Sequence, residues 1–411
     1  MTNWSRPIGS AVTLAALALL VVLGLRLERP PDADLRNGQV FIQDNLTSDG
    51  ALEYGVWVGS DGTPFAGRRT DRGDWRVVDL SRLPGNPLAA PTRDDTHNIY
   101  VAGVDARGSV HIAGNMHDEP LRYVRSAPDR LAGWRSTPAP RGAERVTYPA
   151  FTSLPDGTLL FWRRVGVAGR GHVVLDELRP GASRWRSLGT VLDGRPTGES
   201  PYLNRIATDP RTGTIHLLFE WRATEDPDTT NDVGYARSRD GGRTWERSDG
   251  TRLRRPITHE SAETVIDTLP SGSGLLNSGG LAVDSEGRPH GVVTWQPPTG
   301  EPAFEHVWLD GDNVWRRERL SDLGLEGRAQ IAATPDGRIW LLGVDAGEVV
   351  AVDVTPGQDD RERRTLASVP VGWAVNFDSL ALARAGELRM LIPDGSEPHV
   401  VEVSLGVGSG D

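Results

Sequence analysis

The chain of 411 residues contains no cysteine and no lysine, so its 45 basic residues are all arginine. The absence of cysteine excludes thiol catalysis, iron–sulfur clusters, zinc–thiolate sites and a lipidated N-terminal cysteine. The absence of lysine excludes covalent catalysis through a lysine amine. The net charge is -11 and the sequence has no run of basic residues, which argues against nucleic acid as a partner. An anionic ligand would therefore need a local arginine to hold it.

The N-terminus carries the one long apolar stretch of the chain. Arg6 precedes an uncharged, mostly apolar run from Ala11 to Leu25, and the Pro30-Pro31 pair follows. A basic flank, an apolar core and a polar exit are typical of an export signal. Pro7 to Leu25 is close to the length that spans a bilayer, and no small-x-small cleavage site follows. We expect residues 1–32 to be a signal-anchor or signal peptide with linker, built on one apolar helix.

This segment predicts where the rest of the chain works. An uncleaved anchor gives a single-pass protein of the cell membrane whose globular part lies outside the cytoplasm. A cleaved signal gives a secreted protein.

A turn that usually contains Asp and Gly, followed at once by an apolar strand, recurs along the chain. The turn glycines are Gly62, Gly108, Gly157, Gly213, Gly287, Gly337 and Gly386. Asp or Asn with Gly is typical of hairpins, because these residues accept a positive φ cheaply. Most of these turns are about fifty residues apart, a period in the range of propellers. A Trp followed by polar residues interleaves with them, as expected for an outer strand, at Trp75, Trp134, Trp185, Trp245 and Trp315.

The pattern predicts an all-β fold, with residues 33–411 forming one seven-bladed β-propeller of four-stranded antiparallel blades. No helical periodicity competes after the N-terminal segment. An irregular β-sandwich is the alternative, but seven similar units are hard to place in a sandwich.

One repeat is unusually complete. Ser238 to Trp245 reads SRDGGRTW and matches S-x-D-x-G-x-T-W, the Asp-box or BNR repeat. The Asp and Ser side chains are expected to cap backbone amides in the turn while the Trp packs inward. The motif therefore indicates fold rather than catalysis. Asp boxes occur in sialidases and in many carbohydrate-active or carbohydrate-binding propellers, but the Arg-Ile-Pro motif of sialidases is missing here.

A longer stretch carries a more specific resemblance. Asp95 to Tyr123 reads DTHNIYVAGVDARGSVHIAGNMHDEPLRY. It resembles the BNR-repeat family of seven-bladed propellers that includes ulvan lyases and related rhamnose/glucuronate-cleaving enzymes, most clearly over residues 95–164 and 201–245. Lyase members of that family use two histidines, a tyrosine and an arginine. The resemblance places these catalytic roles on His97, His117, Tyr148 and Arg164.

These residue types suit β-elimination on a uronic-acid polymer. An arginine pairs with the uronate carboxylate, so that the adjacent C5 proton becomes acidic. A neutral histidine takes that proton. A tyrosine whose pKa is lowered by the guanidinium serves the departing C4 oxygen. The chemical step requires no metal, and neither a metal site nor a cofactor is predicted; the acidic loop at Glu225, Asp226 and Asp228 is interpreted as solvated.

Each catalytic candidate also has a structural interpretation. His97 and Tyr148 stand at a turn and at a strand entrance, where capping and packing are common. Arg163 and Arg164 are neighbours in a strand, so alternation sends them to opposite faces and leaves one of them solvated. His111, His216 and His290 share one offset after a turn glycine, which predicts a packing role.

Three further residues are candidates for substrate binding. Tyr202 and Arg205 come just before the fourth turn, where family members place substrate contacts. Asn115 is placed to orient a histidine.

The sequence thus predicts an extracellular carbohydrate-active propeller that cleaves a uronic-acid-containing polysaccharide of the rhamnose/glucuronate type by β-elimination. Two alternatives stay open. One is a non-catalytic cell-surface propeller that binds glycans or serves as a scaffold. The other is an exo-acting glycoside hydrolase, which needs spaced carboxylates such as Asp95, Glu199 and Glu260. The expected partners are a polysaccharide or oligosaccharide and, through the N-terminal segment, a membrane; the oligomeric state is left open.

Overall fold

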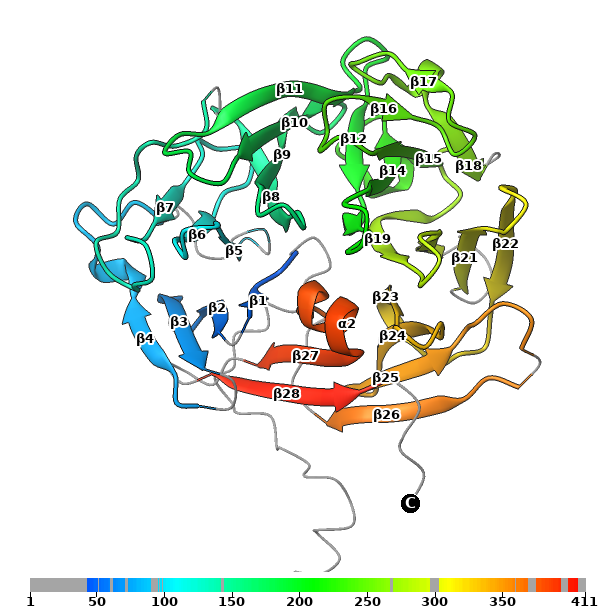
Figure 1. Cartoon of the computed structure of the whole chain (residues 1–411). Helices are drawn as coiled ribbons and strands as arrows, with labels where there is room; N and C mark the ends of the chain where they lie inside the picture. The colour runs from blue at the N-terminus through cyan, green and yellow to red at the C-terminus, as the bar shows by residue number, and fades with distance from the viewer. Residues whose placement is uncertain are drawn as a thin grey trace, which may run out of the picture.

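The computed structural model describes residues 43–405 except 51, 60–61, 71–72, 90–94, 96, 98, 142–143, 267–268, 296–302, 359, 369–374 and 393–397. In this part of the chain, antiparallel strands form seven sheets arranged around a central axis, which is a β-propeller (Figure 1). The chain passes once around the ring, so that the first and last described sheets lie side by side (Figure 1).

Five sheets have four strands or more. They are β1–β4 (Leu46–Asp49, Leu52–Val58, Pro64–Thr70, Arg76–Asp79), β8–β11 (Val146–Ser153, Leu159–Val167, Arg170–Leu178, Arg186–Asp193), β12–β18 (Ser200–Leu203, Ala207–Thr208, Ile215–Arg222, Thr230–Ser238, Trp245–Glu246, Arg252–Leu253, Glu263–Ile266), β19–β22 (Leu275–Val283, Pro289–Trp295, Ala303–Leu309, Trp315–Leu320) and β23–β26 (Glu326–Ala333, Ile339–Asp345, Glu348–Asp353, Arg363–Ser368).

The other two sheets are smaller. They are β5–β7 (Tyr100–Val104, Val110–Gly114, Tyr123–Arg125) and β27–β28 (Glu387–Ile392, His399–Ser404). The predicted all-β propeller is confirmed. The predicted count of seven four-stranded blades is not, because five sheets of the described chain reach four strands.

The structure adds a short helix that the sequence did not predict. Helix α2 (Ser379–Ala385) begins where the Asp378 carboxylate accepts hydrogen bonds from the amides of Leu380 and Ala381. Seven residues are too few for a helical period to show. Three 3-10 turns complete the described elements, η2 (Leu80–Arg82), η3 (Pro227–Thr229) and η4 (His259–Ser261).

The predicted N-terminal apolar helix and the boundary at residue 32 lie outside the described residues. Among the residues that are described, no helix has the length and apolar character needed to cross a membrane.

The turn glycines are where the repeat places them. All seven have φ between 68° and 87°, a region that glycine enters without steric cost. Six separate two strands, whereas Gly386 ends helix α2. The histidines at the shared offset are buried, and each ring bonds a neighbouring side chain at 2.6 to 3.0 Å, in the pairs His111–Tyr123, His216–Tyr235 and His290–His306. Their predicted packing role is confirmed.

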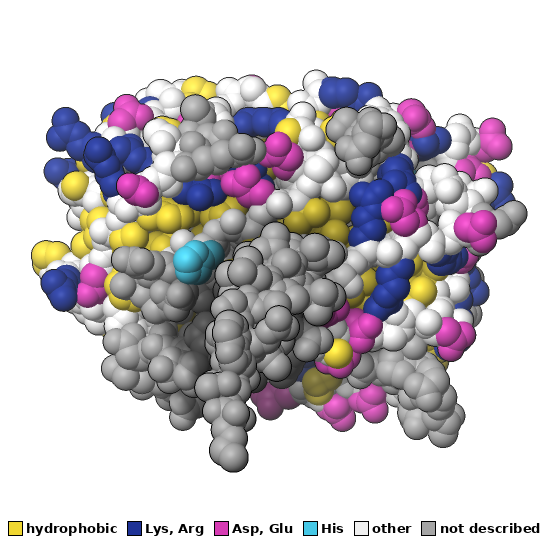
Figure 2. Space-filling view, turned by 90° about the horizontal axis from the view of Figure 1, so that it is seen from below, with side chains coloured by type: hydrophobic (Ala, Val, Ile, Leu, Met, Phe, Trp, Pro, Cys, Tyr) yellow, Lys and Arg dark blue, Asp and Glu magenta, His cyan; other side chains and the backbone are white. Residues whose placement is uncertain are grey.

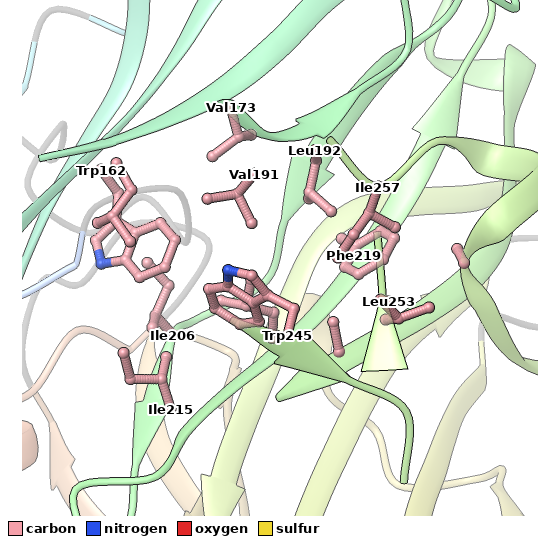
Figure 3. Packing of buried hydrophobic residues seen from close by; sticks show 14 of the residues in the cluster. Trp162, Val173, Val191, Leu192, Ile206, Ile215, Phe219, Trp245, Leu253 and Ile257 are labelled. Atoms are coloured by element: carbon pink, nitrogen blue, oxygen red, sulfur yellow. The ribbon is translucent and has the colours of Figure 1, made fainter. Parts of the chain in front are cut away.

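The Asp box forms the expected lock between β15 and β16. The Ser238 hydroxyl accepts from the amide of Gly242 at 2.8 Å, and the Asp240 carboxylate accepts from the amide of Thr244 at 2.8 Å and from its hydroxyl at 2.7 Å. Trp245 is buried and meets Trp162 edge to face, with ring centroids 6.1 Å apart (Figure 3). The turn thus fixes an indole that packs the sheet β12–β18 against the sheet β8–β11.

Removing the Asp240 carboxylate is expected to lower the free energy of unfolding by about 1–3 kcal/mol, because backbone amides of the turn lose their acceptor. Urea denaturation of Asp240→Ala measures this. The matched control is Asp312→Ala at an exposed turn, which should change the free energy of unfolding by less than about 0.5 kcal/mol. Equal midpoints for the two variants would contradict the assigned role of the box.

Ion pairs join the two ends of the ring. Arg389 of β27 pairs with Glu53 of β2 at 2.7 Å, and Arg69 of β3 pairs with Glu402 of β28 at 3.0 Å. Arginine and acidic side chains also intermingle over the rim (Figure 2). About half of the arginines that the structure describes pair with a carboxylate, and the buried Arg163 and Arg205 are among them, so a buried arginine without such a partner is informative.

Candidate active site

The four predicted catalytic residues meet at one end of the propeller. His97 precedes β5 and His117 follows β6, while Tyr148 is near the start of β8 and Arg164 is near the end of β9. Since consecutive strands of each sheet are antiparallel, these starts and ends lie at the same end of the ring.

Asp95 joins the two histidines. Its Oδ1 lies 2.7 Å from Nδ1 of His97, and its Oδ2 lies 2.7 Å from Nδ1 of His117. The two imidazole rings stack with centroids 3.8 Å apart and an angle of 18° between their planes. Sequence reasoning considered Asp95 only as a possible hydrolytic carboxylate and missed this bridging position.

The bridge fixes the charges of the cluster. Burial alone would raise the pKa of Asp95, but hydrogen bonds from the His97 amide and from both rings lower it to about 2. Burial, followed by the neighbouring His117, lowers the pKa of His97 to about 4. His97 is therefore a neutral ring at pH 7. Because an ionised carboxylate only accepts hydrogen bonds, the ring proton sits on Nδ1 and leaves Nε2 as an acceptor.

Tyr148 stands next to that acceptor. Its hydroxyl lies 3.2 Å from Nε2 of His97. The residue has φ of 53° in a bulge where the register between β8 and β9 shifts, a costly conformation for a tyrosine. Arg164 lowers the pKa of this phenol as expected, but the net shift has the opposite direction. Burial outweighs Arg164 and raises the pKa of Tyr148 to about 12, so the hydroxyl is protonated and can donate.

Arg164 is a buried cation that pairs with no carboxylate of the described residues. Its side chain lies over the rings of Tyr148 and Tyr202, with its guanidinium carbon 4.9 and 4.7 Å from their centroids. Its Nε and Nη1 are buried and make no hydrogen bond to the described residues. The described chain also places no acidic side chain within ion-pair distance of it. A buried charge in this state is costly unless an anion compensates it.

Other buried arginines show the contrast. Arg163, on the opposite face of β9, pairs with Asp176, and Arg205 pairs with Asp44 at 2.6 Å. The expectation that one of Arg163 and Arg164 is solvated is wrong, because they are 1% and 4% exposed.

The three residues predicted to bind substrate lie at different distances from the cluster. Tyr202 adjoins the cluster, since its ring centroid lies 5.7 Å from that of Tyr148. Tyr202 is only 2% exposed. The other two bond to groups outside the cluster. Arg205 is buried, pairs with Asp44 and also donates to the Phe377 carbonyl at 2.7 Å. Asn115 donates to the carbonyl of Leu88 at 2.7 Å rather than to a histidine.

A further histidine at this end of the ring, His259, is held by two carboxylates. His259 bonds Glu199 at 2.8 Å and Asp232 at 2.9 Å, and its ring stacks on Trp221. The hydrogen bond to Glu199 raises the pKa of His259, and burial opposes it only in part. Glu199, one of the carboxylates available for hydrolysis, is thus committed to an ion pair.

Asp95, His97 and His117 also form a set of metal-ligand types. One oxygen and two ring nitrogens of these residues lie within 4.8 Å of one another. The sequence shows no dense cluster of ligand residues, and these three come together only in the structure.

Two cavities border strand β8, one toward each of its ends. A small cavity of about 30 Å³, room for about one water, borders Tyr148 and Arg164. A larger one of about 640 Å³ borders Thr152 and Ser153 at the far end of β8. Arg205 borders both. The titratable cluster marks the first end as the candidate site, although its cavity is the smaller one.

Known proteins share this fold and part of the sequence. An ulvan lyase, long isoform, of Alteromonas sp is 22% identical over 229 residues, which cover 49% of this chain and 22% of that protein. The chain thus matches about a fifth of the length of that relative.

Two solved structures are similar over most of their length. The PL25 ulvan lyase bound to -[GlcA(1-4)Rha3S]- has a TM-score of 0.69 and 14% identity, covering 93% of this chain and 96% of that one. The polysaccharide lyase Uly1 has a TM-score of 0.65 and 16% identity, covering 89% and 90%. The family described as BNR repeat-containing family member matches residues 52–323. The repeat, the Asp box and this match agree: the chain belongs to the BNR repeat-containing family of β-propellers.

Proposed function

We propose that this protein cleaves a uronic-acid-containing polysaccharide of the rhamnose/glucuronate type by β-elimination. The observation that carries the proposal is Arg164, a buried cation that lacks a carboxylate partner in the described chain and lies against Tyr148 and beside His97. A uronate carboxylate is an anion of the right size and shape for a guanidinium, which binds it bidentately.

The first step is neutralisation of the uronate. With the carboxylate held by Arg164, negative charge that develops at C5 is delocalised into a group already paired with a cation. A fixed cation in a site of low dielectric stabilises such charge more than water does.

The second step is removal of the C5 proton by Nε2 of His97. The ring is neutral and its Nδ1–H donates to Asp95, so Nε2 carries the free electron pair. Asp95 stays ionised and stabilises the imidazolium that forms.

The third step is loss of the C4 substituent. The electrons of the C5–H bond form the C4–C5 double bond, and the C4–O bond breaks. The departing oxygen takes the proton of the Tyr148 hydroxyl, which is available because the pKa of this phenol is about 12. The imidazolium of His97, 3.2 Å away, can return a proton to Tyr148.

The comparisons support the substrate class without assigning it. Both solved structures described above are lyases by their names, and one of them holds -[GlcA(1-4)Rha3S]-. At these identities the likeness itself is one of fold, so the proposal depends on the geometry of the cluster.

Two of the three carboxylates that the sequence offers for hydrolysis do not suit that reaction. A glycosidase needs a carboxylic acid that is protonated near neutral pH. The pKa of Asp95 is about 2, and the pKa of Glu199 is also lowered, since hydrogen bonds from His259 and Thr197 outweigh burial. Neither carboxylate suits the acid role.

The test is the ultraviolet absorbance of an unsaturated uronate product. The full chain, in a mild detergent because of its apolar N-terminal segment, is incubated with a panel of uronate polysaccharides that includes ulvan. We expect absorbance to rise with at least one substrate. Folded protein that releases neither unsaturated product nor reducing ends would reject the lyase and favour the glycan-binding alternative.

We further propose that the propeller acts outside the cytoplasm, tethered by residues 1–32 or secreted after their removal. Cell fractionation with N-terminal sequencing of the mature protein separates these two cases. Recovery of intact chain from the cytosol would reject both.

A further inference from the structure

The cluster of Asp95, His97 and His117 has features of a metal site that elimination does not require. Both Nδ1 atoms point at the one carboxylate, each at 2.7 Å from an oxygen. The rings stack with centroids 3.8 Å apart, and because both Nδ1 atoms face Asp95, the two nitrogens lie on the same side of the pair. Ligand atoms of all three residues lie within 4.8 Å of one another.

We propose that Asp95, His97 and His117 bind a divalent cation of the zinc class, and that the bound cation blocks the base function of His97. Two imidazole nitrogens and one carboxylate oxygen suit Zn²⁺, whereas Ca²⁺ and Mg²⁺ prefer oxygen ligands alone. Zinc sites with three protein ligands keep a fourth position open. The side chain of His117 is 39% exposed, which gives the ion a path from solvent.

The ligand set also has an outer hydrogen-bond partner. On the far side of the His97 ring, Tyr148 lies 3.2 Å from Nε2 and can serve as the outer hydrogen-bond partner that metal-bound histidines usually have.

Binding changes the tautomer of His97. Without the ion, Nδ1–H donates to Asp95 and Nε2 accepts from Tyr148. With the ion on Nδ1, the single ring proton sits on Nε2 and is donated to the Tyr148 oxygen. Nε2 then has no electron pair with which to take a substrate proton. This second half of the inference, loss of base function, rests on the proposed function; the binding half does not.

The binding half is tested by calorimetric titration of the full chain with ZnCl₂ after dialysis against a chelator. We expect one site that Asp95→Asn and His117→Ala each weaken at least about tenfold. His399→Ala, an exposed histidine of β28, is the matched control and should bind like the parent. CaCl₂ should give no comparable binding. Because His117 is exposed and Asn keeps the shape of Asp, both variants are expected to fold, which circular dichroism checks.

Equal zinc affinity in the parent and in both site variants would overturn the proposal. The blocking half is tested on the cleavage assay, where Zn²⁺ should slow product formation and a chelator should restore it. Zinc that binds through Asp95 and His117 but leaves the cleavage rate unchanged would overturn that half. A parent that cleaves nothing even without zinc would count against the proposed lyase, and the titration would still decide whether the ion binds.

Discussion

Replacement of His97 by alanine is expected to lower kcat of uronate elimination by about 10²- to 10⁴-fold, the usual effect of losing a general base. The ring is the group whose Nε2 adjoins the Tyr148 hydroxyl, and its Nδ1 is fixed by Asp95. Tyr148→Phe removes the proton donor and should cost a comparable factor. The rate of absorbance increase measures the effect of each substitution. The control is His399→Ala in the two-stranded sheet β27–β28, which should keep the parent rate.

The pH profile separates a base from a packing residue. The pKa of His97 is lowered to about 4, and the neutral form is the base, so kcat/KM should fall as the pH drops through about 4 rather than through about 6.5. Asp95→Asn withdraws the carboxylate that raises the pKa of this ring, and should also cost activity because the tautomer is no longer fixed. A parent profile whose acid limb lies near 6.5, or a His97→Ala variant with parental kcat, would assign the base to another group.

Much of the fold could be predicted because residues close together in the sequence determine its turns and hairpins. A turn at Gly157 or Gly337 needs only its own glycine to reach a positive φ, and the Asp box from Ser238 to Trp245 closes within one hairpin. Helix α2 was not predicted, because its N-terminal cap is the single residue Asp378 and its length is less than two helical repeats. The unequal number of strands per sheet was not predicted either. The recurring Asp-Gly turn indicates one pair of strands and does not show how many further strands join that pair.

The residues of the candidate site could be predicted from the sequence, but their pKa values and hydrogen bonds could not. The resemblance named His97, His117, Tyr148 and Arg164, and the structure brings them together. The direction of the Tyr148 pKa depends on burial by side chains from other sheets, which the sequence does not display. The bridge by Asp95 depends on two loops that lie 22 residues apart in sequence.

Arg163 and Arg164 give the sharpest contrast between a structural and a functional group. They are adjacent, chemically identical and both buried. Among the residues that the structure describes, Arg163 has a carboxylate partner, Asp176, which is itself 1% exposed, and Arg164 has none. Asp176→Ala leaves the Arg163 charge buried and uncompensated. It is therefore expected to lower the free energy of unfolding by about 3–5 kcal/mol, measured by urea denaturation.

Arg164→Gln is expected to do the opposite. It removes a cation that has no carboxylate partner in the described chain, so the free energy of unfolding should stay the same or rise. Elimination should nevertheless slow by about 10²- to 10³-fold, as when a single group that stabilises developing charge is lost. Arg164→Lys keeps the charge but not the bidentate fork and should recover only part of the rate.

The two measurements decide the role of Arg164 together. If Arg164→Gln destabilises the fold as much as Asp176→Ala does, Arg164 is a packing residue and its unpaired nitrogens carry no functional meaning. If the variant is as stable as the parent but has lost elimination, the free energy spent on burying an uncompensated guanidinium is explained by the substrate carboxylate that it receives. A loss of rate that a uronate ester substrate does not share would point to the same conclusion, since an ester offers no anion for Arg164 to neutralise.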